Sequence, residues 1–214
     1  MPAPSAPRRP PIAREGWGYA SGFLILTLAA AYWEGWGWAA AFGAATLFIA
    51  GFFRDPERTP PQEPGAVLAP ADGRVVTVDR QEGGAGVIRI FLSPLDVHIN
   101  RSPVSGQITK AEYVKGRFLA AYKDEASEAN ERNALDIRAV SGENFRVVQI
   151  AGVLARRIVC WRKAGDELRA GERFGLIQFG SRTDLYLPAG YAASVRPGER
   201  VRGGETIVAR ALAR

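Results

Sequence analysis

A serine, a histidine and an aspartate stand in positions of this 214-residue chain where they could do chemistry together. Ser181 follows Gly180 in the segment FGSRT, between two apolar stretches. Glycine leaves its carbonyl unshielded and tolerates strained backbone angles, so the serine hydroxyl can attack it in an N→O acyl shift. The resulting ester can eliminate to dehydroalanine and hydrolyse to a pyruvoyl group. We therefore predict that the chain cuts itself between Gly180 and Ser181, although the same dipeptide is common in plain turns.

His98 is the only histidine in the chain. It is therefore the only side chain whose unperturbed pKa suits proton transfer near neutral pH. It lies in the segment FLSPLDVHIN, directly after a predicted strand. Asp72 lies in a Pro-Ala-Asp-Gly turn, where aspartate is also ordinary for structural reasons. His98 and Asp72 are the candidate partners of Ser181.

The composition is that of a folded protein with an anionic partner. With 47% apolar residues, the chain can hold a membrane segment and one domain of about 150 residues with a real core. The lone cysteine, Cys160, lies in an apolar strand-like run and excludes an internal disulfide. One cysteine and one histidine do not make an ordinary zinc site, so we expect no metal and inert packing for Cys160. The net charge of +6 favours nucleic acid or anionic lipid as a partner.

Two uncharged apolar runs, residues 16–33 and 35–53, flank Glu34. Each is about 27–29 Å long as a helix, close to the ~30 Å hydrocarbon core of a bilayer. We predict a disordered N-terminus over 1–15 and a membrane hairpin over 16–53. Aromatic residues lie at the ends and tip, and arginines flank the outer ends, so both ends should be cytoplasmic. The alternatives are a signal peptide cleaved near Ala29-Ala30-Ala31 and a re-entrant hairpin that does not fully cross.

The remaining chain is predicted to be mostly β. Residues 54–66 form a polar, proline-rich linker, and the domain spans 67–214. Short apolar runs separated by Gly, Pro and Asp turns favour a barrel or sandwich. Phe118 to Asn133 departs from this pattern and is predicted to be a helix or a loop.

An internal repeat refines the fold class. The segment from Gly165 to Phe174 matches the segment from Gly198 to Ile207, with glycines, acidic residues and apolar residues at the same places. Paired turn-and-strand units of this kind indicate a barrel-sandwich-like β domain with quasi-repeated strand units, preceded by the hydrophobic helical hairpin. Domains of this type that carry lipoyl or biotinyl groups need a lysine at the hairpin tip, and the chain has none after Lys163.

Several motifs in one order make the chain resemble the phosphatidylserine decarboxylases, in particular their short bacterial and archaeal branch. They are the hairpin, PADG, FLSPLDVHINRSPVSG, Asn130-Glu131-Arg132 and FGSRTDLYLP, and the likeness runs from about residue 15 to about residue 210. The resemblance implies a proenzyme that cuts itself into a β chain, 1–180, and an α chain, 181–214. The two would remain a heterodimer that could assemble further.

The resemblance also implies a cofactor and a substrate. Ser181 would become a pyruvoyl group, whose ketone forms a Schiff base with the amine of phosphatidylserine; loss of CO₂ then yields phosphatidylethanolamine. Such a substrate favours the cytoplasmic face of the cell membrane as the site of action and argues against nucleic acid as a partner.

Family roles carry over to three positions. Asp72 matches the aspartate that assists self-cleavage with a histidine. Longer relatives carry two histidines three residues apart, of which the first matches His98 and the second falls on Arg101. His98 could therefore serve self-cleavage, decarboxylation or both. Arg101 could bind the substrate phosphate or carboxylate, or be a solvated turn charge.

Two other functions are compatible with the sequence. One is a non-catalytic, membrane-tethered barrel-sandwich adaptor. The other is a pyruvoyl decarboxylase of a soluble amino acid, which the hydrophobic hairpin disfavours. For Asn130-Glu131-Arg132, we consider a loop at the mouth of the active site and a capped, solvated helix end.

Overall fold

The computed structural model describes residues 10–80, 86–117, 130–152, 157–178 and 181–212. The chain divides into two compact units, residues 1–57 and residues 58–214. The second unit thus begins inside the predicted linker. The predicted disordered segment lies largely outside the described residues, and so do residues 118–129 of the stretch predicted as helix or loop.

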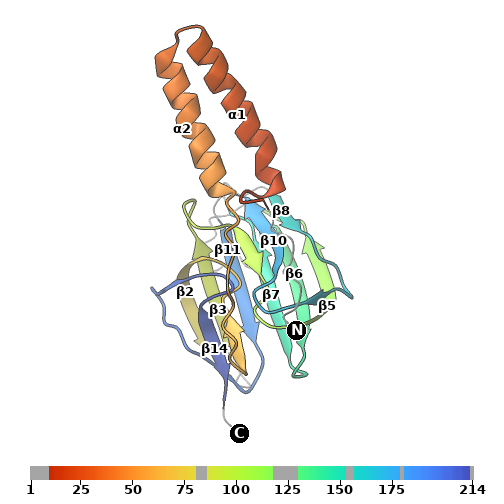
Figure 1. The fold of residues 1–214 in the computed structure, drawn as a ribbon. Coiled ribbons are helices and arrows are strands. Elements are labelled where there is room, and N and C mark those ends of the chain that lie inside the picture. The colour runs from red at the N-terminus through yellow and green to blue at the C-terminus, as the bar shows by residue number, and fades with distance from the viewer. Residues whose placement is uncertain (1–9, 81–85, 118–129, 153–156, 179–180, 213–214) are drawn as a thin grey trace, which may run out of the picture. The chain divides into compact units, whose positions relative to one another are not determined.

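The N-terminal unit is a helical hairpin, drawn in red and orange in Figure 1. Helix α1 (Arg14–Tyr32) and helix α2 (Trp36–Phe52) are joined by a short turn in which Glu34 has a positive φ of 57°. At the open end, the backbone N–H of Ala13 donates to the carbonyl of Phe53 at 2.8 Å. Gly16 lets the helices close there, because a Cβ at this position would lie 2.5 Å from the Phe53 side chain.

Large apolar side chains cover the outside of the hairpin. Trp33, Trp36 and Leu47 have exposed fractions of 77%, 70% and 75%. Soluble monomeric proteins rarely expose so many large apolar groups together. Within the described part of the chain, no helix combines the length and apolar character that crossing a membrane requires.

The second unit is built from strands, as predicted. The first seven are β1 (Ala66–Leu68), β2 (Gly73–Arg80), β3 (Gly86–Leu92), β4 (Ile99–Arg101), β5 (Gly106–Val114), β6 (Arg132–Ala139) and β7 (Asn144–Ile150). They are followed by β8 (Arg157–Cys160), β9 (Glu167–Leu168), β10 (Arg173–Gln178), β11 (Ser181–Leu187), β12 (Tyr191–Ala193), β13 (Arg200–Val201) and β14 (Ile207–Ala211).

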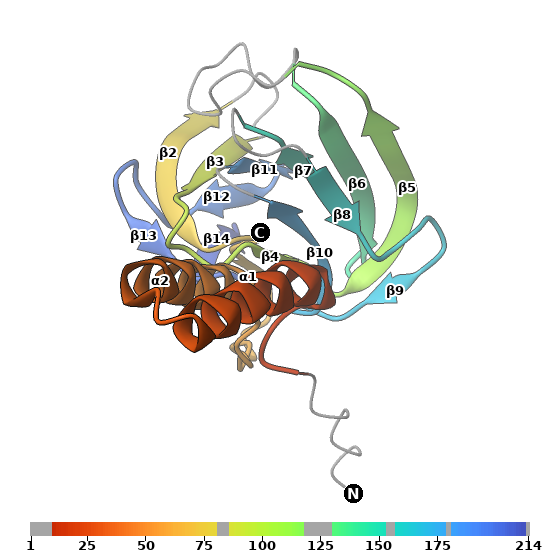
Figure 2. The same ribbon diagram turned by 90° about the horizontal axis from the view of Figure 1, so that it is seen from above.

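Three antiparallel sheets form this unit. The largest has the strand order β13-β2-β3-β11-β7-β6-β5-β9, and Figure 2 shows it bent into an arc. The other two have the orders β4-β10-β8 and β1-β14-β12. The predicted fold class, mostly β with a preceding helical hairpin, is confirmed.

The core lies on the concave side of the curved sheet. Leu185 on β11, Val147 on β7 and Leu135 on β6 are fully buried and occupy one register row across three strands. Such inward-facing aliphatic residues account for most of the main core cluster. Burying a side chain of this size stabilises the fold by about 1.5–3 kcal/mol.

The repeat seen in the sequence is a pseudo-twofold symmetry of the sheet. Strands β9 and β13, which belong to the two repeats, pair with β5 and β2 at opposite edges. The strand starts Gly73 and Gly106 are also equivalent. A Cβ at either one would lie 2.1–2.2 Å from a carbonyl of the neighbouring strand, so the backbones approach too closely for any other residue.

Candidate active site

Strand β11 begins at Ser181, beside the end of β3 and the turn that leads to His98. We call this place the reactive corner. Ser181 pairs with Leu92, the last residue of β3. The chain then turns through residues 93–97 to His98, whose carbonyl accepts a hydrogen bond from the N–H of Ile177 on β10 at 3.2 Å. The structure therefore brings the serine and the histidine to the same end of the curved sheet. Gly180, the other half of the predicted cleavage site, lies outside the described residues.

Ser181 is fully buried, and its Oγ has no hydrogen-bond partner among the described residues. A buried hydroxyl without a partner costs about 1–3 kcal/mol. Most serines in such places point to a carbonyl or to water instead. The arrangement leaves both the proton and the lone pairs of this hydroxyl available for chemistry.

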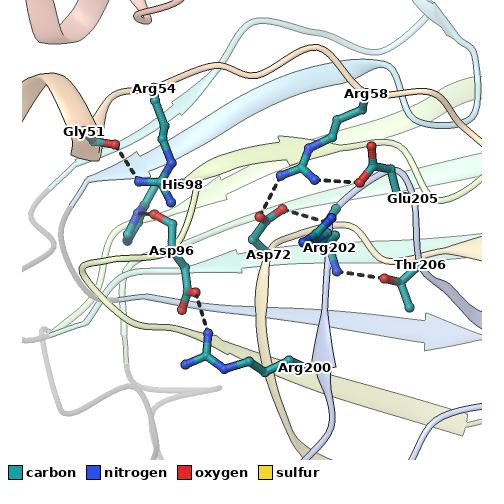
Figure 3. A network of polar contacts seen from close by, with 11 residues as sticks. Gly51, Arg54, Arg58, Asp72, Asp96, His98, Arg200, Arg202, Glu205 and Thr206 are labelled. Atoms are coloured by element: carbon teal, nitrogen blue, oxygen red, sulfur yellow. Dashed lines mark hydrogen bonds and ion pairs between the residues drawn. The ribbon is translucent and has the colours of Figure 1, made fainter.

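His98 is 2% exposed and has a defined tautomer. Its Nδ1 lies 2.9 Å from the carbonyl oxygen of Asp96, which can only accept, so Nδ1 carries the proton (Figure 3). In the neutral ring, Nε2 is then the basic nitrogen. The Asp96 carboxylate shapes this turn by accepting from the N–H of Ser93 at 2.8 Å. The turn thus supplies a histidine ready to accept a proton through Nε2.

Asp72 is bound on both carboxylate oxygens, but not by His98. Oδ1 accepts from the N–H of Gly203 at 2.8 Å, and Oδ2 accepts from Arg58 at 2.9 Å (Figure 3). Arg58 also donates to Glu205 at 2.6 Å. Burial raises the pKa of Asp72, while the hydrogen bond from Gly203 and the charge of Arg58 oppose that rise.

The sheet register separates Asp72 from Ser181. Arg74 and Arg182 lie opposite the same residue, Phe91, on the two sides of β3. Strands are about 4.8 Å apart, so the starts of β2 and β11 are about 10 Å apart. Asp72 and Ser181 therefore lie at the starts of strands that β3 separates.

The pseudo-twofold symmetry shows which contact of Asp72 occurs in both repeats and which occurs only at the aspartate. Its equivalent in the other repeat is Ser105, whose hydroxyl accepts from the N–H of Ala170 at 2.9 Å. The bond from Gly203 is thus a shared feature of both turns. The ion pair with Arg58 is what distinguishes the aspartate. Sequence reasoning missed Arg58 because it assigned this residue to the linker.

Arg101 is buried, with 3% exposure. Its Nη1 donates to the carbonyl of Gly171 at 3.1 Å, and its side chain lies against Gly204, the equivalent glycine of the second repeat. Arg101 therefore joins the two repeats. The interpretation as a solvated turn charge is wrong.

Asn130 and Glu131 are buried, with exposures of 0% and 9%. Asn130 forms a bridge with Arg117 and donates to the carbonyl of Ala151 at 2.7 Å, and Arg132 begins β6. The prediction that this segment is exposed to solvent is therefore wrong, and the residues before Asn130 lie outside the described part of the chain. Cys160 on β8 is half-buried, and burial raises the pKa of its thiol, which disfavours the reactive thiolate. No group of three potential metal ligands occurs among the described residues.

Comparison with known proteins identifies the family. Residues 45–209 match the model of the phosphatidylserine decarboxylase family. The chain is 49% identical to the phosphatidylserine decarboxylase proenzyme of Symbiobacterium thermophilum, over 95% of this chain and 97% of that protein. It is 53% identical to the proenzyme of Granulibacter bethesdensis, over 78% and 72%. It is 42% identical to that of Desulfotalea psychrophila, over 92% and 95%.

Proposed function

Because the chain belongs to the phosphatidylserine decarboxylase family, we propose that it converts phosphatidylserine to phosphatidylethanolamine with a pyruvoyl group made from Ser181. The observation that carries the proposal is the buried Ser181 hydroxyl, without a partner among the described residues, at the corner that also contains His98. The related proteins are named proenzymes, which agrees with a chain that is processed before it acts.

Self-cleavage starts with the Ser181 hydroxyl. His98 Nε2 takes the hydroxyl proton while Oγ bonds to the carbonyl carbon of Gly180, and the peptide C–N bond breaks to leave an ester and a free amine. Loss of the Ser181 α-proton expels the Gly180 carboxylate and leaves dehydroalanine. Its imine tautomer takes up water and releases ammonia, which completes the pyruvoyl group.

Asp72 acts at a distance in this proposal. Its charge, kept in place by Gly203 and Arg58, stabilises the positive charge that His98 gains when it takes the hydroxyl proton. A pyruvoyl group supplies a ketone that accepts the substrate amine and draws electrons from the carboxylate-bearing carbon. His98 is then the candidate to return a proton to that carbon. Arg101, buried against Gly171, is assigned first to support of the site, and binding of a substrate anion remains its second proposed role.

The cleavage products are expected to stay together as a heterodimer. Strand β11 of the 181–214 segment is paired along its length with β3 and for most of its length with β7. Strands β13 and β14 of the same segment pair with β2 and β1. These four strand pairings join the two products. Assembly beyond this heterodimer is a further expectation.

We assign the protein to the cell membrane, with the catalytic domain on the cytoplasmic face. The support is the exposed apolar surface of α1 and α2, together with a net charge of +6 that attracts anionic headgroups. Trp33 and Trp36, both at least 70% exposed at the hairpin tip, are suited to the interface between lipid and water.

The test compares wild-type protein with Ser181→Ala on vesicles that contain phosphatidylserine, with phosphatidylethanolamine measured by mass spectrometry. We expect two fragments and lipid product from the wild type, and an uncut 23.1 kDa chain without product from the variant. An uncut, inactive wild type would support the adaptor instead. Activity on free serine but not on vesicles would support the decarboxylase of a soluble amino acid.

A further inference from the structure

A row of buried polar side chains crosses the core next to the reactive corner. Asn133 on β6, Gln149 on β7 and Thr183 on β11 lie opposite one another in register, and each is 5% exposed or less. Asn100, on β4 of a different sheet, is also fully buried. We call these four residues the amide layer.

Hydrogen bonds link the amide layer in one direction. Asn133 donates to Gln149 at 2.8 Å, and Gln149 donates to Asn100 at 2.9 Å. Asn100 in turn donates to the hydroxyl of Thr183 at 3.1 Å. Gln149 and Asn100 each accept from the preceding residue through the amide oxygen and donate to the next through the amide nitrogen. Such a chain is mutually polarised, and it is costly if one member is removed.

The amide layer separates an apolar core from the reactive corner. Two residues further along β11, the next inward row is Leu185, Val147 and Leu135, which is entirely aliphatic. Two residues in the other direction lies Ser181. Aliphatic side chains would fill the polar row at no cost in unmet hydrogen bonds. The amides therefore provide a directional contact that aliphatic packing cannot provide.

The bond from Asn100 to Thr183 joins β4, which begins one residue after His98, to β11, which begins with Ser181. His98 precedes Asn100 by two residues, and Ser181 precedes Thr183 by two residues. Residues two apart in an extended chain are close neighbours, so this bond joins the two segments two residues beyond His98 and two residues beyond Ser181. The backbone contact of Ile177 with His98 is at the same corner.

We propose that the amide layer positions Ser181 against His98, and that the bond from Asn100 to Thr183 is its decisive contact. This inference rests on the proposed self-cleavage. Neither residue takes part in bond making; both are positioning residues. The bond fixes β4 relative to β11, which belong to different sheets and share no backbone ladder.

The test measures the rate of self-cleavage of newly synthesised full-length chain, by gel, for Thr183→Val and Thr183→Ser. Valine keeps the shape and removes the hydroxyl, while serine keeps the hydroxyl. Displacing reacting groups by about 1 Å can cost about 100-fold in rate, so we expect Thr183→Val to cleave about 10- to 100-fold more slowly. Thr183→Ser should stay within about threefold of wild type, and both should keep the wild-type pH profile of cleavage.

The matched control is Val147→Ala, which weakens the neighbouring apolar row and leaves the amide layer intact. It should lower the melting temperature at least as much as Thr183→Val and leave the cleavage rate near wild type. If the two variants slow cleavage equally, or if Thr183→Val cleaves at the wild-type rate, the positioning role is refuted.

Two further results keep the inference testable. If Thr183→Val does not fold, Asn100→Ala removes the same bond from the other side, and wild-type cleavage by this variant would refute the inference. If wild-type chain itself does not cleave, the proposed function fails, and that result is distinguishable from all of these.

Discussion

Removal of the Arg58 side chain should show how much its charge offsets the cost of burying the Asp72 carboxylate. Arg58 bridges Asp72 and Glu205, at 2.9 and 2.6 Å, and the side chains of Arg58 and Asp72 are only 10% and 14% exposed. In Arg58→Ala, the carboxylate of Asp72 keeps the N–H of Gly203 but loses its counter-charge. The variant should therefore be less stable at neutral pH.

The size of the effect follows from the burial of the pair. Removing one partner of a fully buried ion pair costs about 3–5 kcal/mol. The remaining bond from Gly203 and the slight exposure reduce this to about 2–3 kcal/mol at pH 7. Glu205, with 30% side-chain exposure, adds less than about 1 kcal/mol. The matched control is Arg200→Ala, because Arg200 pairs with Asp96 but is 68% exposed, and it should cost about 0–1 kcal/mol.

The dependence on pH has a definite sign. Burial raises the pKa of Asp72, so ionising this group costs folded-state stability. The cost is absent below the unfolded pKa, about 3.9, grows as the pH rises from there to the folded pKa, and is complete above it. The charge of Arg58 reduces this cost, so the full cost applies in Arg58→Ala. For Glu205, burial acts to raise the pKa, but the hydrogen bond from Arg58 lowers it overall, and this stabilisation is lost as the pH falls. Both groups make the destabilisation larger at pH 7 than at pH 4.

The assay is urea unfolding followed by circular dichroism at pH 4 and pH 7. All chains carry Ser181→Ala, so that variants do not differ in processing. We expect a loss of about 2–3 kcal/mol for Arg58→Ala at pH 7 and a clearly smaller loss at pH 4. An equal loss at both values, or a loss no larger than that of Arg200→Ala, would refute the reasoning.

Two other substitutions test neighbouring parts of the site. His98→Ala should slow self-cleavage at least about 100-fold, because a general base contributes about 10²–10⁴-fold, and fast cleavage without decarboxylation would move His98 to the second reaction. Asp184→Asn should cost about 3 kcal/mol in urea unfolding, because Asp184 accepts from Arg182 at 2.8 and 3.1 Å in a pair at most 1% exposed. The half-exposed pair of Asp136 with Arg146 is the control, and Asp136→Asn should cost less than about 1 kcal/mol.

The sequence predicted the parts of the site that are encoded locally. Alternating apolar residues and turn signals located the strands, and the repeat near the C-terminus indicated the quasi-symmetric β fold. His98 was identified because the chain has no second histidine. Ser181 was identified from its neighbour and from the family motifs around it.

The contacts made across the fold could not be predicted in this way. Arg58 looked like a linker charge, and its partners Asp72 and Glu205 are far from it in sequence. Arg101 looked as suited to solvent as to substrate, because no local pattern shows that two glycine turns bury it. One signal was present but overlooked: the Pro-x-x-Gly segments at residues 70–73 and 103–106 are equivalent, and they identify Ser105 as the counterpart of Asp72.

The amide layer illustrates the same limit. Asn133, Gln149 and Thr183 stand in three strands whose register cannot be known from the sequence, and each would be unremarkable on a solvent-facing surface. Only the pairing of β6, β7 and β11 aligns them, and only the packing of β4 places Asn100 against them. Their directional bonds follow from tertiary structure.

The account depends most on the fate of Ser181, which mass spectrometry of the purified, denatured wild-type protein can determine. We predict two chains: residues 1–180 with an ordinary carboxylate end, and residues 181–214 beginning with a pyruvoyl group. The second chain should be lighter by one ammonia than a peptide that begins with serine. A single intact chain of 23.1 kDa, or a fragment that starts with unmodified Ser181, would contradict the account.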